Sequence, residues 1–145
     1  MRQLLLLTIL LTQFPSSAFS QKRCECKATD RFGYGGHETI TFEEKRIYQG
    51  LEGMVMDASA SPLQNAVVEV FPVPDKIGPN NAKRRVTACL TGTDGRFCFP
   101  HFKAGKYRVS VSAEGFKVTD VILTVDASHW RSRRKGLDII LQVGT

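Results

Sequence analysis

Residues 86–113 read VTACLTGTDGRFCFPHFKAGKYRVSVSA and contain three short segments in which apolar and polar side chains alternate. The segments are Val86–Thr91, Arg96–Pro100 and Lys106–Ala113, and glycine-containing turns separate them. Alternation with a period of two places successive side chains on opposite faces of a β-strand. The pair Asp94–Gly95 between the first two segments is typical of a tight hairpin turn. This region therefore predicts three strands in close succession, the first two of them paired.

The same pattern continues on both sides of this region. Four more alternating or apolar segments are bounded by turn residues: Leu51–Asp57, Ala66–Val73, Val118–Val125 and Leu137–Val143. No stretch after residue 20 has helical periodicity of useful length. Seven short strands with frequent turns predict an all-β fold, a seven-stranded antiparallel Greek-key β-sandwich. Alternate residues of each strand are then expected to fill the space between two sheets.

The first 20 residues are typical of a secretory signal peptide. They contain the basic residue Arg2, the largely apolar run Leu4–Leu11, and small residues at Ala18 and Ser20. The apolar run is too short to span a bilayer, and a retained anchor helix is the alternative interpretation. We therefore expect residues 1–20 to be removed and the protein to be secreted, or exported to the periplasm or cell surface.

The remainder divides into two parts. Residues 21–49 form a polar, cysteine-bearing N-terminal segment, in which Phe32–Gly36 is rich in glycine and Glu38–Phe42 alternates like a single strand. Residues 50–145 contain the seven strands and form the predicted sandwich domain. A sandwich of this size can fold alone, but its core is small.

The composition of the chain excludes several classes of protein. It has 145 residues, a net charge of +6, 42% hydrophobic residues and 23% charged residues. These fractions are those of a folded protein and not of a disordered one. The length leaves no room for two large domains. Removal of Arg2 with the signal peptide lowers the net charge to +5, a modest excess that fits attraction to anionic surfaces. Export argues against nucleic acid as the partner.

The mature chain has four cysteines: Cys24, Cys26, Cys89 and Cys98. An even number in an exported protein favours disulfides, with three possible connectivities. A Cys24–Cys26 bond would close a very short, strained ring and is the least favoured. Two bridges from the N-terminal pair to Cys89 and Cys98 are one alternative, and a single Cys89–Cys98 cross-strand bridge is the other. A zinc site is a further, weaker interpretation of the C-x-C pattern.

Two longer motifs resemble a known family. Residues 53–70 read GMVMDASASPLQNAVVEV, and residues 93–116 read TDGRFCFPHFKAGKYRVSVSAEGF. Both are similar to the carboxypeptidase regulatory-like domain, and the resemblance covers about residues 50–143. It implies a transthyretin-like, or prealbumin-like, sandwich that is also classed with carbohydrate-binding-like folds. It further implies an accessory or interaction module without catalytic activity. The cysteine-bearing N-terminal segment lies outside the pattern of the family.

Residues that would indicate catalysis are missing from the sequence. No nucleophile-elbow, phosphate-loop or zinc-protease motif occurs. The intradiol dioxygenases, which have a related sandwich, bind iron through two tyrosines and two histidines, including a His-x-His pair. Here His37, His101 and His129 are far apart, and Glu43–Glu44 is interpreted as a solvated charge pair. We therefore expect no enzyme activity, no cofactor and no metal; a small hydrolase on a transthyretin-like fold is the least favoured alternative.

The best candidates for ligand contacts lie in one basic loop before the last strand. They are His129, Trp130, Arg131, Arg133, Arg134 and Lys135. A tryptophan can stack on a sugar, and the cations can meet sulfates, carboxylates or phosphates. A solvated connection is the alternative interpretation. The sequence thus predicts a secreted, non-catalytic binding module for an extracellular polysaccharide or cell-surface protein. A structural subunit that assembles by edge-strand pairing is the alternative.

Overall fold

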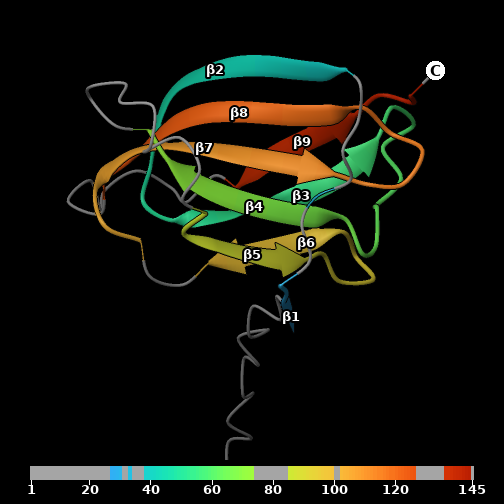
Figure 1. Ribbon diagram of the computed structural model, residues 1–145, viewed down its shortest axis with the longest axis horizontal. Coiled ribbons are helices and arrows are strands. Elements are labelled where there is room, and N and C mark those ends of the chain that lie inside the picture. Colours follow the sequence, from blue (N-terminus) through green and yellow to red (C-terminus); the bar gives the residue numbers. More distant parts are fainter. Residues whose placement is uncertain are drawn as a thin grey trace, which may run out of the picture.

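The computed structural model describes residues 27–30, 33, 38–73, 85–99, 102–126 and 136–144. These residues form two β-sheets that pack face to face (Figure 1). The large sheet has the strand order β1-β5-β4-β7-β8-β2, and the small sheet has the order β6-β3-β9. The strand bounds are β1 Lys27–Ala28, β2 Thr39–Tyr48, β3 Leu51–Asp57, β4 Val67–Pro72, β5 Thr87–Leu90, β6 Arg96–Phe99, β7 Gly105–Ser112, β8 Val118–Val125 and β9 Leu137–Leu141.

The predicted all-β sandwich is confirmed. Each of the seven segments expected after residue 50 forms a strand, β3 to β9, with bounds that differ from the expectation by at most two residues. The described residues contain no helix, and so none that is long and apolar enough to cross a membrane. The segment Glu38–Phe42 also forms a strand, but β2 is longer than predicted and extends to Tyr48.

The pairing of the strands differs from the sequence prediction at three places. The prediction was antiparallel pairing, but β2 runs parallel to β8 and β3 runs parallel to β9. In addition, β5 and β6 do not form the expected hairpin, because β5 belongs to the large sheet and β6 to the small one. Alternation identifies the faces of a strand but not its partner. The turn at Gly92–Gly95 therefore carries the chain from one sheet to the other, with Gly95 at a φ of 71°.

Hydrophobic side chains from both sheets meet in one core. The fully buried members include Leu51 and Val55 of β3, Val109 of β7, and Val125 of β8. At one end, the rings of Phe97, Phe99, Phe102 and Tyr107 follow one another, with successive centroids 6.3, 5.9 and 4.8 Å apart. Tilted and edge-to-face contacts of this kind are favourable beyond the area that they bury. The alternation predicted from the sequence thus produces the space-filling core of a sandwich.

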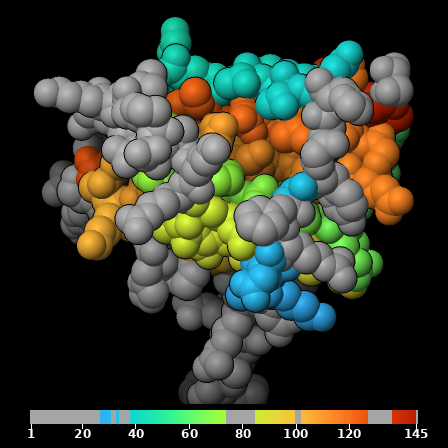
Figure 2. Space-filling model, viewed as in Figure 1, coloured from blue at the N-terminus to red at the C-terminus, as the bar shows by residue number. Residues whose placement is uncertain are grey.

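The N-terminal segment contributes the two outermost strands of the large sheet. Its first part, β1, pairs with β5, where Ala28 lies opposite Cys89. Its second part, β2, lies at the other border of the sheet, beside β8 (Figures 1 and 2). Between them, Gly33 lies against β4, because its N–H donates a hydrogen bond to Glu69 Oε2. The segment therefore reaches from one border of the large sheet to the other.

The two described cysteines point to different sides of the sandwich. Cys89 lies opposite Val68 and belongs to the core between the sheets, with 2% of its surface exposed. Cys98 lies between the inward-facing Phe97 and Phe99, so its side chain is on the outer face of the small sheet. Both are disulfide-bonded. The alternative of a Cys89–Cys98 bridge assumed that the two cysteines are neighbours on paired strands. That assumption is wrong, because β5 and β6 belong to different sheets.

Close backbone packing between the two parallel strands of the small sheet requires a glycine. A Cβ atom at Gly53 would lie 1.9 Å from the carbonyl oxygen of Leu137 on β9 and 2.9 Å from the ring of Phe97. We expect Gly53→Ala to lower the free energy of unfolding by about 2–3 kcal/mol, because β3 and β9 must move apart. Denaturant unfolding measures this loss. Gly50→Ala is the control, since nothing lies within 4 Å of its added Cβ; equal losses in both variants would contradict the explanation.

The disulfide pattern is the second prediction. Cys24 and Cys26 lie outside the described residues, but the register of β1 places Ala28, two residues after Cys26, beside Cys89. We expect two bridges that join the N-terminal pair to Cys89 and Cys98. Peptide mapping by mass spectrometry without reduction should give linked peptides that each contain one N-terminal cysteine. A peptide that joins Cys89 to Cys98 would contradict this pairing.

Candidate functional site

The six ligand-binding candidates of the basic loop lie outside the described residues. His129, Trp130 and the four cations between Arg131 and Lys135 follow the end of β8 at Val125 and precede β9, which begins at Leu137. Their role in binding stays a prediction.

A groove forms where the large sheet extends beyond the small one. β2 lies outside β8 in the large sheet, whereas β9 is the last described strand on that side of the small sheet (Figure 1). The described strands of the small sheet therefore cover the inner faces of β4 and β7 but not that of β2. The open space has a volume of about 360 Å³. It is lined by Phe42, Glu43, Glu44, Thr119, Val121, Leu137, Asp138, Ile139 and Ile140.

The floor and borders of the groove are largely apolar. Val121, Leu137 and Ile139 are buried and belong to the core, so they form a fixed floor. Phe42 lies directly opposite Val121 and shares its inward-facing side, yet 52% of its surface is exposed. Across the groove, Ile140 on β9 is 54% exposed. Two large hydrophobic side chains thus remain in contact with solvent on opposite borders, which is a common property of interaction sites.

Three carboxylates accompany these apolar side chains. The pairing of β2 with β8 shifts between Glu43 and Ile47, and such bulges redirect side chains. Glu43 pairs with Lys106 at 3.0 Å and Glu44 with Arg46 at 3.6 Å. Asp138, which is exposed on β9, has no ion pair among the described residues. Glu43 and Glu44 are thus each paired with a cation, and Asp138 is the carboxylate of the three that has none among the described residues.

The phenol of Tyr48 lies near two of these carboxylates, at the end of β2. Tyr48 is buried, and burial raises its pKa above the ordinary value of 10.0. The negative charges of Glu44 and Asp138 raise the pKa further, while Arg46 opposes them. Glu44 of the large sheet and Asp138 of the small sheet both line the groove.

A polar atom in the groove lacks a partner. Thr119 pairs with Ile40 of β2 and points to the inner side of the large sheet, with 2% of its surface exposed. Its Oγ1 has no hydrogen-bond partner in the described part of the chain. Buried hydroxyl groups in native proteins are nearly always hydrogen-bonded. Thr119 is therefore a buried polar group at the floor of the groove whose hydroxyl has no partner among the described residues.

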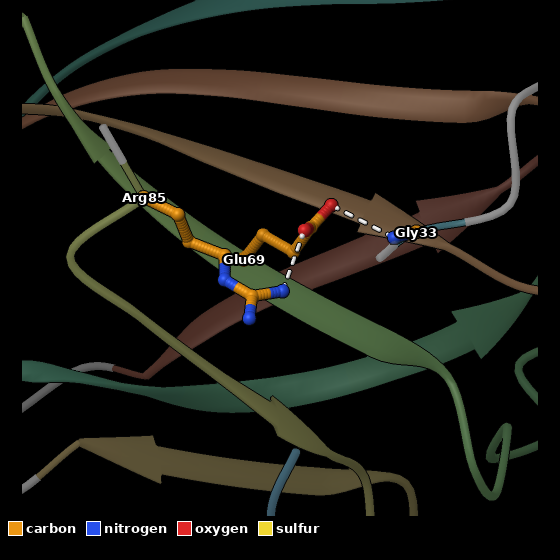
Figure 3. Close-up of polar contacts among 3 residues, drawn as sticks. All are labelled: Gly33, Glu69 and Arg85. Atoms are coloured by element: carbon orange, nitrogen blue, oxygen red, sulfur yellow. Dashed lines mark hydrogen bonds and ion pairs between the residues drawn. The ribbon is translucent and has the colours of Figure 1, made fainter. Parts of the chain in front are cut away.

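A second group of charged residues lies on the outer face of the large sheet (Figure 3). Glu69 Oε1 accepts a hydrogen bond from Arg85 Nη1 at 3.2 Å, and Oε2 accepts one from the Gly33 N–H at 3.1 Å. A Cβ atom at Gly33 would lie only 2.6 Å from Ser112 Oγ. Both oxygens of this carboxylate are thus engaged: Oε2 holds the N-terminal segment against β4, and Oε1 pairs with Arg85 next to β5.

A further ion pair lies on the same outer face. Asp120 Oδ2 is 3.5 Å from Arg108 Nη1, and the Arg108 guanidinium lies 4.5 Å from the centre of the Phe71 ring. Asp120 Oδ1 has no hydrogen-bond partner among the described residues. The pair joins neighbouring strands β7 and β8 and is consistent with a structural role. Within the described ranges, no three His, Cys, Asp or Glu side chains are arranged to hold a metal ion.

The comparison with family models identifies the domain. The model of the carboxypeptidase regulatory-like domain matches residues 50–140. The chain belongs to the carboxypeptidase regulatory-like domain family. The resemblance inferred from residues 53–70 and 93–116 is therefore confirmed. The match begins after β2, so one wall of the groove lies outside the carboxypeptidase regulatory-like domain, and β8 and most of β9 lie within it.

Comparisons with individual proteins add similarities of overall structure. No curated protein matches the chain in sequence. Catechol 1,2-dioxygenase from Pseudomonas arvilla C-1 matches 81% of this chain at 14% identity with a TM-score of 0.42, and the match spans 62% of the dioxygenase. 3-Chlorocatechol 1,2-dioxygenase from Rhodococcus opacus 1CP matches 85% of this chain at 12% identity with a TM-score of 0.43, and the match spans 74% of that protein. Hydroxyquinol 1,2-dioxygenase from Pseudomonas putida DLL-E4 matches 85% of this chain at 12% identity with a TM-score of 0.40, and the match spans 68% of that protein. Nothing about the activity of this chain follows from values this low.

Sequence reasoning did not identify the groove. Glu43–Glu44 was interpreted as a solvated pair, and both residues do form ion pairs, but they also line the groove. The residue that marks the site is Phe42, which faces inward and is nevertheless exposed. Its inward orientation follows from the parallel pairing of β2 with β8, which the sequence does not reveal.

The raised pKa of Tyr48 predicts a pH dependence of stability. The folded protein holds this proton more tightly than the unfolded chain does, so the contribution is fully present below pH 10 and is lost as the pH rises through the folded-state pKa. We expect wild-type protein to lose more stability than Tyr48→Phe above about pH 10. Denaturant unfolding of both proteins between pH 8 and pH 11 measures the difference. An identical pH dependence in the two proteins would contradict the prediction.

Proposed function

We propose that this protein is a secreted, non-catalytic interaction module whose partner docks in the groove between β2 and β9. The observation that carries the proposal is the groove itself, where Phe42 and Ile140 are more than half exposed on either side of a buried apolar floor. Such side chains gain free energy when a partner removes them from water, at about 25 cal/mol per Å² of buried apolar surface.

The construction of the groove also supports a binding role. Its floor is made of core residues of two sheets, so the shape of the site is fixed by the packing of the domain. The exposed Asp138 adds a charged group that can select a partner. A largely preformed site with few polar groups loses little conformational entropy on binding.

The chemistry of the described residues supports a role without catalysis. The carboxylate of Glu69 is engaged at both oxygens, and Asp120 faces Arg108 across a strand pair. The phenol of the buried Tyr48, with its raised pKa, remains protonated at neutral pH and is a poor nucleophile. Together with the missing sequence motifs, these observations favour binding over reaction chemistry.

An extracellular polysaccharide is the alternative ligand, and Trp130 is the residue on which that alternative depends. Polysaccharide binding would require no contribution from the groove, because the basic segment before β9 has its own aromatic and cationic side chains. The two proposals therefore predict different sensitive residues. For both, the protein acts outside the cell, at the cell surface or in the periplasm.

Selection of peptide ligands tests the proposed function. We expect the exported, disulfide-bonded protein to enrich groove-dependent peptides from a random peptide library displayed on phage. Phe42→Ser with Ile140→Ser should weaken binding of the selected peptides at least tenfold, because two exposed apolar contacts are lost. Val86→Ser is the matched control, since Val86 is equally exposed but lies beside β5.

A glycan array distinguishes the polysaccharide alternative from the groove proposal. Glycan binding that is lost in Trp130→Ala but is kept in the Phe42 and Ile140 variant would support the alternative. If, in addition, the library yielded no peptide that distinguishes wild type from the groove variant, the proposed function would be wrong.

A further inference from the structure

We infer that the groove receives an extended, cationic segment of a partner protein, which adds as a strand to the free edge of β9 beneath β2. The inference rests on the proposed function and specifies the chemistry and the binding mode of the partner. Four features of the described residues support it: the missing strand position, the closed end of the groove, the alternation of its side chains and its charge.

Among the described residues, the small sheet has no strand at the position where the groove lies. The large sheet continues past β8 to β2, while the small sheet ends at β9 among the described strands. A strand placed beside β9 would lie about 4.8 Å from it and about 10 Å from the large sheet. It would then cover the inward-facing Phe42, as strands of the small sheet cover the equivalent positions of β4 and β7. An edge strand with an open place beside it is a template for an added strand.

The groove is closed at one end. Lys117 N–H donates a hydrogen bond to the Gln142 carbonyl at 2.8 Å, and Gly144 N–H donates one to the Gly115 carbonyl at 2.9 Å. Phe116 and Val143 form a bridge between these bonds. The two sheets are therefore tied together just past the end of β9. An added strand would lie alongside Leu137–Leu141 and stop at this junction.

The side chains of the groove predict an alternating partner. Inward-facing residues of an added strand would meet the ring of Phe42 and the side chain of Val121, and these contacts favour apolar residues. Outward-facing residues would lie beside Asp138 and Ile140, the two exposed side chains of β9. Opposite charges at neighbouring positions on one face of a sheet are stabilising. A lysine or arginine beside Asp138, between apolar neighbours, therefore satisfies both faces.

The charge of the site distinguishes this partner from a second copy of the chain. Glu44 and Asp138 both line the groove, and Asp138 has no ion pair within the described residues. If two copies paired through β9, each would bring the same carboxylates to the shared interface. Like charges at such positions are destabilising. A cationic partner instead neutralises Asp138.

Binding of synthetic peptides tests the inference. The probe is a short peptide that alternates lysine and valine, with two matched peptides: one alternates glutamate and valine, and the other carries the lysine sequence with N-methyl groups that prevent strand pairing. We expect only the unmodified lysine peptide to bind tightly. Amide hydrogen exchange of the full mature protein should slow at Leu137–Leu141 when this peptide binds, because added-strand hydrogen bonds protect β9 amides.

Variants of the groove test the role of charge. We expect Asp138→Asn with Glu44→Gln to weaken binding of the lysine peptide about tenfold at low salt, with a smaller difference at high salt. Asp94→Asn is the matched control, since Asp94 is an exposed carboxylate in the turn before β6 and pairs with Arg96. The circular dichroism and the denaturation midpoint of each variant establish that it is folded.

Each contrary result overturns a defined part of the inference. Equal binding of the lysine and glutamate peptides would overturn the cationic partner. Equal binding of the N-methylated peptide, or an unchanged exchange rate at β9, would overturn strand addition. A dimer in sedimentation that is lost in Ile140→Asp would show that a second copy occupies the groove. After any of these results, the proposed function would still hold if the phage library had yielded groove-dependent peptides. If no groove-dependent ligand were found at all, the proposed function and this inference would both be overturned.

Discussion

The unequal width of the two sheets is the constraint on which the other features depend. In the described part of the chain, six strands form one layer and three form the other, so the small sheet covers only part of the inner face of the large one. Where it covers that face, Val109 and Val125 are fully buried. Where it does not, the same alternation leaves Phe42 exposed in an inward-facing position. The apolar groove is thus a direct result of the strand count of each layer, and needs no special residues.

The N-terminal segment widens the large sheet from four described strands to six. The family match begins at residue 50, and the segment before it adds β1 at one border of the large sheet and β2 at the other. Gly33 and Glu69 hold the chain against β4 between these strands. Exposed sheet edges tend to pair with other chains, and here β1 and β2 cover the edges of β5 and β8. The segment therefore protects the large sheet, and the opening that it creates lies next to the small sheet.

Much of the sandwich could be predicted from the sequence, because alternation and turn residues are local properties. All seven strands after residue 50 were found this way, as were the inward-facing Phe97 and Phe99. The partners of the strands could not be predicted, because Asp94–Gly95 fits a hairpin as well as a crossing between sheets. The parallel pairing of Thr39 with Val118 has no local signal at all. For this reason the Glu43–Glu44 pair could be recognised as charged, but not as part of a groove.

The pairing of β2 with β8 also has a consequence for how the protein folds. Its two strands are far apart in sequence, and between them lies most of the family domain, residues 50–140. Contacts between distant residues carry a large loop-closure entropy and form slowly. The N-terminal segment leaves the ribosome first, but β2 has no partner until Val118–Val125 has emerged. We therefore expect the sandwich to assemble before β2 docks, so that the groove is completed in the last step of folding.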